Sequence, residues 1–261
     1  MHPKIWAVCP FSRPKQLEWV FEHFDAQAHP SKAIVFVFNG DARDMTVPTQ
    51  RRDVHVVYSP ANVSDAMNTG LEFVRRHAVR GDWFAKWDDD DFYSPRYLAD
   101  IAQASSNARA IGRTHVWCKS QSNRLWSLDY GDINTNAPHG PTLAASIDIA
   151  ENFPATGDVP WGEDVAWWKL MRSRGVLFTN LPRDGFCWMR YASEDHHHTC
   201  PLGDAEMQSM AVGGVIDYGG FSLDVVNGLE SRQGTECEEP PLDFDAFSRA
   251  IERTLARSNH G

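Results

Sequence analysis

The sequence has 261 residues, 42% of them hydrophobic, and its 35 acidic residues outnumber its 25 basic ones for a net charge of -10. A chain of this size is able to bury one sizeable core, and its negative charge disfavours nucleic acid and anionic membranes as partners. Its apolar runs are too short for a signal peptide or a membrane helix. The 5 cysteines form no CxxC pair, which argues against a disulfide framework and a structural zinc site. We therefore expect a globular, enzyme-sized protein of the reducing cytoplasm.

The first hundred residues alternate short apolar runs with helix-length segments. Strands are predicted where β-branched and aromatic residues gather, at 4–9, 33–38, 54–58 and 83–87. Helical spacing is shown by Leu17, Val20, Phe21 and Phe24 after Pro14, and by Met67, Leu71, Val74 and Ala78. Ser64 is the predicted N-cap of the second stripe. This alternation predicts a mostly parallel sheet flanked by helices, whose ligands gather at the carboxyl ends of the strands.

The pattern loosens after about residue 100. Loop-like tracts occupy 120–123 and 129–141, and a helix is predicted from about 162 to 174, where Gly175 ends it. A polar, glycine-rich tract then leads to a last amphipathic helix that Asp243 is able to cap. No linker divides the chain, so we expect one domain.

Four consecutive aspartates, Asp88 to Asp91, directly follow the strand predicted at 83–87. Adjacent carboxylates repel one another, so either all four point into water or a cation neutralises some of them. A hard cation such as Mg²⁺ or Mn²⁺ takes one or two carboxylates and completes its shell with water and phosphates. In an extended turn alternate side chains share a direction, which predicts that Asp88 and Asp90 project together. The alternative is a solvated acidic loop, or an aspartate-rich helix start with Pro95 in its first turn.

Two later segments also carry titratable groups. Glu163 and Asp164 open the helix predicted at 162–174, where carboxylates favour the helix dipole, and that alone accounts for them. A carboxylate there also suits a general base, provided that burial or a second carboxylate raises its pKa. Three histidines at 196–198 follow an aromatic tract and form either metal ligands or a surface cluster.

Five segments, taken in order, resemble the GT-A-fold glycosyltransferases of family 2. They are CPFSRP (9–14), VFNGD (37–41), ANVSDAMNTG (61–70), KWDDDDFYSPRYL (86–98) and WGEDVAWW (161–168). The resemblance covers roughly residues 4 to 200 and implies a Rossmann-like central sheet with an elaborated acceptor side. On this basis the single domain, 1–261, divides into a nucleotide-binding half (1–100), an acceptor-binding half (101–200) and a C-terminal extension with a terminal helix (201–261).

The resemblance also implies roles for particular residues. Contacts to the donor nucleotide fall to Pro10, Ser12, Arg13, Asn39, Asp65, Asp88, Asp89 and Thr142. Asp90 would bind Mn²⁺ or Mg²⁺, with His198, or alternatively His196, completing the metal shell. Asp164 would be the general base, with Glu163 as its partner. Many relatives carry Asp where Asn39 stands, so the base is left open, with uracil as the first expectation.

The expected function is metal-dependent transfer of a sugar from a nucleotide diphosphate, with a UDP-sugar as the first expectation, to an acceptor hydroxyl, with inversion at the anomeric carbon. One alternative is a nucleotidyltransferase or phosphohydrolase, which grips Mg²⁺ and phosphates with similar aspartates. Another is a non-catalytic Ca²⁺- or carbohydrate-binding module that holds glycan on Trp161, Trp167, Trp168 and Trp188. The acceptor stays open among polysaccharide, lipid-linked sugar, protein, small molecule and modified nucleobase, although the negative charge argues against DNA.

Overall fold

The computed structural model describes residues 2–42, 45, 47, 51–59, 62–155, 162–190, 204–205, 208, 211, 213–231 and 233–236. The expectations for Trp161, His196, His198 and the helix after Asp243 concern residues outside this set. Within the set, no helix combines the length and apolarity needed to cross a membrane. The thiols of Cys9, Cys118 and Cys187 are free and buried.

Among the described residues, a first sheet has seven strands in the order β10-β6-β9-β4-β1-β2-β3. Its strands are β1 (Ile5–Phe11), β2 (Lys32–Phe38), β3 (Val54–Tyr58), β4 (Trp83–Lys86), β6 (Ala110–Gly112), β9 (Ala144–Ser146) and β10 (Phe178–Asn180). Strands β3, β2, β1 and β4 are parallel neighbours, as are β6 and β10, whereas β9 runs antiparallel to β4 and β6. The predicted mixed α/β fold with a mostly parallel central sheet is confirmed, and so are its four N-terminal strands.

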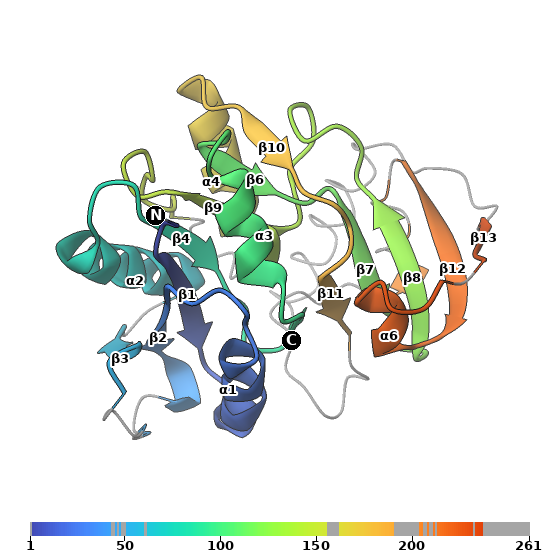
Figure 1. Ribbon diagram of the computed structural model, residues 1–261, viewed down its shortest axis with the longest axis horizontal. Helices are drawn as coiled ribbons and strands as arrows, with labels where there is room; N and C mark the ends of the chain where they lie inside the picture. The colour runs from blue at the N-terminus through green and yellow to red at the C-terminus, as the bar shows by residue number, and fades with distance from the viewer. Residues whose placement is uncertain are drawn as a thin grey trace, which may run out of the picture.

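Helices cover both faces of this sheet (Figure 1). They are α1 (Leu17–Asp25) and α3 (Tyr97–Ala104) on one face, and α2 (Val63–His77) and α4 (Glu163–Ser173) on the other. Alternate residues of β1 serve the two faces: Ile5 and Ala7 face the first pair of helices, and Trp6 and Val8 the second. Gly70 brings α2 close to the sheet, since a Cβ there would lie 2.4 Å from Val8 Cγ1.

The start of α2 differs from the prediction. Its N-cap is Asn62, whose Oδ1 accepts a hydrogen bond from the Asp65 backbone N–H at 3.0 Å. Ser64 lies inside the first turn and is fully buried. Asn and Ser both cap helices well, so residue type alone does not show which of the two is the N-cap. The extended backbone of Asn62 identifies it as the N-cap.

A second sheet, which the sequence reading missed, has six strands in the order β13-β12-β8-β7-β11-β5 among the described residues. Its strands are β5 (Phe92–Tyr93), β7 (His115–Lys119), β8 (Arg124–Asp129), β11 (Phe186–Met189), β12 (Gly214–Gly220) and β13 (Thr235–Glu236). The short helix α6 (Leu223–Val226) packs on it, as Figure 1 shows. Three short 3-10 turns complete the described elements: η1 (Pro14–Gln16), η2 (Gly40–Ala42) and η3 (Gly140–Thr142).

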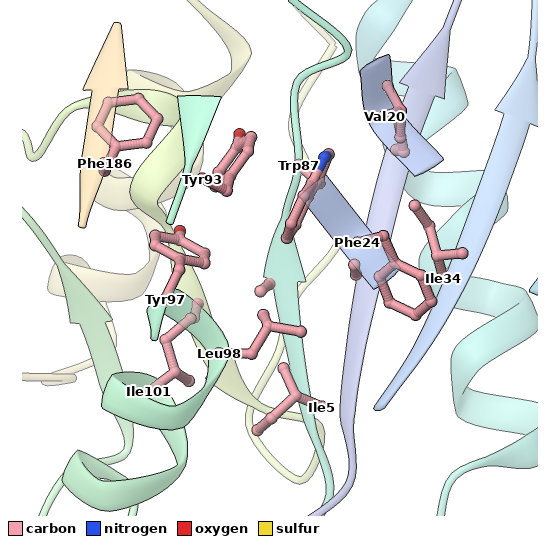
Figure 2. Close-up of a cluster of buried hydrophobic side chains, with 14 of the residues drawn as sticks. Ile5, Val20, Phe24, Ile34, Trp87, Tyr93, Tyr97, Leu98, Ile101 and Phe186 are labelled. Carbon is pink, nitrogen blue, oxygen red and sulfur yellow. The ribbon is translucent and has the colours of Figure 1, made fainter. Parts of the chain in front are cut away.

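An aromatic core joins the two sheets (Figure 2). Trp87 and Tyr93 stack with ring centres 3.9 Å apart, and Phe186 of β11 lies 5.4 Å from the Tyr93 ring. Phe24 of α1 and Tyr97 of α3 approach the Trp87 ring edgewise. Because Trp87 and Tyr93 flank the four aspartates in the sequence, this core fixes both ends of the acidic turn.

Candidate active site

Three loops meet at the carboxyl edge of the first sheet. Ser12 and Arg13 follow β1, Asn39 follows β2, and the aspartates follow β4. The pairing of β1 with β2 and with β4 brings these loops together. The loops after β1 and β2 are in contact range, because a Cβ on Gly40 would lie 3.7 Å from Ser12 Cβ. The predicted gathering of nucleotide-side residues at this edge is therefore observed for Ser12, Arg13, Asn39 and the aspartates.

The acidic turn connects the two sheets, running from β4 in the first to β5 in the second. The Asp88 backbone N–H donates to Tyr93 Oη at 2.8 Å, and the indole N–H of Trp19 donates to the Asp91 carbonyl at 3.1 Å. Asp91 Oδ1 accepts from the Met189 backbone N–H of β11 at 2.9 Å. These bonds hold the turn at a fixed position before any ligand is considered.

Asp89 and Asp90 converge on one cation. Arg13 Nη2 lies 3.0 Å from Asp89 Oδ1, while Arg13 Nη1 pairs with Asp90 Oδ2. The Ser12 backbone N–H donates to Asp89 Oδ2 at 3.4 Å. The expected alternation of side chains is thus wrong, because residues 89 and 90 form a turn rather than extended backbone. The solvated-loop alternative is also wrong, since Asp89, Asp90 and Asp91 are buried.

Lys86 joins the acidic turn to the start of α4. Its Nζ lies 2.6 Å from Asp88 Oδ1 and 3.4 Å from Glu163 Oε1, and its side chain is only 3% exposed. Burial opposes the lysine charge, but Asp88, Glu163 and Asp164 outweigh this and hold the pKa of Lys86 above its ordinary value. A buried cation between two carboxylates fixes the distance between the two halves of the site.

Burial and mutual repulsion shape the protonation of the carboxyl groups. Burial, against the opposing charge of Arg13, raises the pKa of Asp89 to about 7. Burial, then Asp90 and Asp88, raise the pKa of Asp91 well above its ordinary value. Burial and the neighbouring Asp164 raise the pKa of Glu163 to about 7. The site therefore favours additional positive charge, which would relieve the repulsion among these groups.

Asp164 lies against the η3 turn at Gly140. A Cβ on Gly140 would fall 1.5 Å from Asp164 Oδ2, so only glycine leaves room for this carboxylate. Asp164 Oδ1 accepts a hydrogen bond from the Val165 backbone N–H at 2.7 Å. Gly162, with φ 87°, turns the chain into α4 and directs the first helical turn toward the acidic turn. Sequence spacing points only weakly to the role of Gly140, and for Lys86 it shows no more than a charge within an apolar strand.

Thr142 does not serve the expected donor contact. It is fully buried, its hydroxyl donates to the His139 carbonyl at 2.6 Å, and it accepts from the Arg113 backbone N–H at 2.9 Å. The first bond closes the η3 turn and the second ties it to the residue after β6, so the side chain has a structural part in holding that turn. This correction could not come from the sequence, which does not show whether a loop hydroxyl faces inward.

The described tryptophans among those that would hold glycan occupy two kinds of position. Trp167 and Trp168 belong to the core under α4, and their indole N–H groups donate to the Glu151 and Ile133 carbonyls. Trp188 of β11 is only partly buried, and its ring centre lies 4.5 Å from that of His139. Burial, then the charges of nearby Lys86 and Arg190, lower the pKa of His139 to about 3, so the ring stays neutral. Trp188 and His139 thus form a pair of rings beside Gly140, the residue against which Asp164 lies.

The other residues expected to contact the nucleotide are Pro10, Asn39 and Asp65, which lie in three different settings. Pro10 is partly buried within β1, opposite Val37. The side-chain oxygen of Asn39 is buried without a hydrogen-bond partner, which fits a group that awaits a donor from a ligand. Asp65 is exposed and lines a separate hollow of about 380 Å³ on α2 with Asn68 and Arg75. The structure therefore does not bring Asp65 to the acidic turn.

The donor set fits a divalent cation bound together with phosphate. No group of three or more His, Cys, Asp or Glu residues in the described part of the chain forms a ready-made metal site. Asp90 offers one carboxylate at the carboxyl edge of the sheet, where Arg13 already supplies positive charge. Mg²⁺ and Mn²⁺ sites commonly use one or two protein carboxylates and obtain other ligands from substrate phosphates. Asp90 is accordingly the residue that would hold the metal.

The similarity of this protein to known proteins lies in its fold and not in its sequence. No protein-family model matches the sequence, and no curated protein does. Among matching solved structures, S. aureus TarS 1–349 covers 80% of this chain and 69% of its own, with 12% identity and a TM-score of 0.48. Its complex with UDP-GlcNAc covers 80% and 71%, with 11% identity and a TM-score of 0.47. At this identity and TM-score, the likeness says nothing of the site residues of this chain.

Proposed function

We propose that the protein is a metal-dependent glycosyltransferase that moves a sugar from a nucleotide diphosphate, with uridine diphosphate as the first candidate, to an acceptor hydroxyl. The observation that carries this proposal is the arrangement around Lys86. This buried cation holds the acidic turn, at the nucleotide edge of the sheet, beside the helix start that carries Asp164. This supports a phosphate site at the acidic turn with a carboxylate for an acceptor next to it.

The loops after β1 and β2 would hold the donor nucleotide. Ser12 and Asn39 offer polar groups to the base and ribose, and the unpartnered oxygen of Asn39 suits an N–H of the base. Asp88 lies at the start of the acidic turn and would accept from a ribose hydroxyl. Asp90 would hold Mn²⁺ or Mg²⁺, which supplies Lewis-acid stabilisation of the negative charge on the diphosphate leaving group.

The acceptor side would be formed by α4, η3 and β11. Asp164 stands on the first turn of a helix, which fixes its position, and it is the proposed base for the proton of the attacking hydroxyl. Glu163 is held by Lys86 and keeps that turn in place. Trp188 and His139 would pack on the apolar face of an acceptor sugar. We propose direct displacement with inversion, because one base on the acceptor side suffices for it.

The test combines nucleotide binding with donor turnover. Thermal melting is measured with uridine, guanosine, adenosine and cytidine diphosphates, each with Mn²⁺, Ca²⁺ or chelator, because a ligand that binds only the folded state raises the midpoint. Release of nucleoside diphosphate from the matching nucleotide sugars is then followed. We expect one diphosphate to raise the midpoint only with Mn²⁺, and Asp90→Ala to abolish that rise.

Asp164→Asn separates binding from chemistry. It should keep the nucleotide-dependent rise in melting temperature and lose donor turnover by at least about 100-fold, the usual range for a general base. Asp148→Asn, an exposed carboxylate of the same domain, is the control and should change neither quantity. An active Asp164→Asn protein would refute the assignment of the base. Turnover of nucleoside triphosphates or phosphate esters, or a response to Ca²⁺ alone, would instead favour one of the two alternative classes.

A further inference from the structure

Arg13 supplies positive charge to Asp89 and Asp90 of the acidic turn. Its guanidinium forks across two neighbouring carboxylates, Asp89 at 3.0 Å and Asp90 in a closer ion pair. The Arg13 side chain is 19% exposed, whereas those of Asp89 and Asp90 are 2% and 11% exposed. The arginine thus covers the carboxylates from the solvent side.

The backbone delivers Arg13 to this position. Arg13 precedes Pro14, and its extended backbone, with φ -116° and ψ 90°, avoids the α region that a following proline disfavours. The parallel pairing of β1 with β4 then places the loop after β1 beside the turn after β4. The backbone is held by η1, while the long side chain has several rotatable bonds through which its charged end can move.

We propose that Arg13 is a resident counter-ion, which occupies Asp90 in the free protein and gives it up when a metal and a nucleotide diphosphate bind together. This inference rests on the proposed function. A guanidinium and a divalent cation compete for one carboxylate in a buried site, because their charges repel strongly at low dielectric. A diphosphate removes this conflict, since the planar fork of arginine pairs with phosphate oxygens as well as with carboxylates.

The consequence is coupling between the two ligands. Without nucleotide, the metal must displace Arg13 from Asp90 while Arg13 gains no new partner, so the affinity for the metal is low. With nucleotide, Arg13 gains a new partner and Asp90 becomes available. By linkage, the factor by which the nucleotide raises metal affinity equals the factor by which the metal raises nucleotide affinity.

The experiment measures Mn²⁺ binding directly, through the loss of the electron paramagnetic resonance signal of free Mn²⁺. The folded wild type, Arg13→Gln and Arg51→Gln are titrated with and without uridine diphosphate. Arg51 is the matched control, because it also pairs with two carboxylates, Asp25 and Asp53, before the amino end of β3. Removing it makes the same change in net charge at the opposite edge of the sheet.

Without nucleotide, we expect Arg13→Gln to bind Mn²⁺ about tenfold more tightly than wild type, within the usual range of coupling between sites, and Arg51→Gln to match wild type. Uridine diphosphate should raise the Mn²⁺ affinity of wild type by a larger factor than that of Arg13→Gln. Arg13→Lys keeps the charge but lacks the fork, so its affinity should lie between the two. This variant keeps the test informative if Arg13→Gln folds poorly.

The proposal is overturned if neither Arg13 variant binds Mn²⁺ more tightly than wild type, or if the nucleotide raises Mn²⁺ affinity equally in all three. A complete lack of Mn²⁺ binding in every protein also overturns it. Failure of the proposed function looks different: the predicted Mn²⁺ affinities would be found, while no nucleotide sugar is turned over.

Discussion

The replacement of Gly140 by alanine tests the geometry of the site at one atom. Gly140 does not have a positive φ, so alanine is compatible with its backbone and the effect of the change is steric. The added Cβ would lie 1.5 Å from Asp164 Oδ2 and 2.5 Å from Asp164 Cγ. Since non-bonded atoms rest roughly 3.5 Å apart, the carboxylate must retreat by about 2 Å or the η3 turn must shift.

This displacement should affect the chemical step more than binding. A misplacement of about 1 Å in a reacting group is able to cost about 100-fold in rate, which corresponds to about 2.7 kcal/mol. The contacts of Arg13 and Asp90 lie on the other side of Lys86 and are not touched by the new methyl group. Gly140→Ala should therefore lower donor turnover by about 100-fold and leave the nucleotide-dependent rise in melting temperature intact.

The assay compares initial rates of nucleoside diphosphate release at saturating donor, together with melting curves. Gly220→Ala is the matched control, because Gly220 also lacks a positive φ and a Cβ there meets nothing within 4 Å. It should behave as wild type in both measurements. A Gly140→Ala protein that keeps more than about a third of the wild-type rate would refute the placement of Asp164 against η3 in the working site, because a 2 Å retreat should cost far more.

Three further predictions concern the charges of the site. Lys86→Met should lower the free energy of unfolding by about 3 to 5 kcal/mol in urea titrations, because Asp88 and Glu163 lose their buried partner. Adding Glu163→Gln to this variant should restore part of the lost stability, because one unpaired buried carboxylate is then removed. Because the pKa of Glu163 rises from 4.5 to about 7 on folding, the folded state binds its proton more tightly, so stability should fall as pH rises from 4.5 to about 7. Glu163→Gln should flatten this fall, which melting curves across that range would reveal, and an unchanged pH profile would contradict the assignment. Chelator alone should leave the melting temperature within about 1 °C, because Arg13 and Lys86 already pair with the carboxylates, whereas a large drop would indicate a structural metal.

The elements that the sequence predicted well are those with local signals. The strands at 54–58 and 83–87 are apolar runs bounded by polar residues, and each appears within one residue of its expected bounds. The helix at 162–174 is bracketed by Gly162 and Gly175, both with positive φ in the structure. In these cases the signals that begin and end an element lie next to it in the sequence, so a short stretch of sequence is enough to predict the element.

The second sheet could not be predicted in this way. The two-residue strand β5 exists because it pairs with β11, about ninety residues later in the chain. The hydrogen bond from the Met189 backbone N–H to Asp91 depends on the same long-range contact. Such pairing depends on the packing of the aromatic core rather than on local propensity. The position of Asp164 against Gly140 is of the same kind, since neither residue reveals its partner from sequence spacing.

The acidic turn shows how these two kinds of information combine. Local reasoning counts only the mutual repulsion of its four carboxylates, and so it calls either for exposure to water or for a cation. The fold instead supplies Lys86 from the preceding strand, Arg13 from the loop after the neighbouring strand β1 and a backbone N–H from β11. These protein groups hold the shape of the turn, and a bound cation would act on the charge that remains. Folding and ligand binding at this turn are thereby separate steps, which is the condition under which Arg13 is able to change partners while the chain around it stays in place.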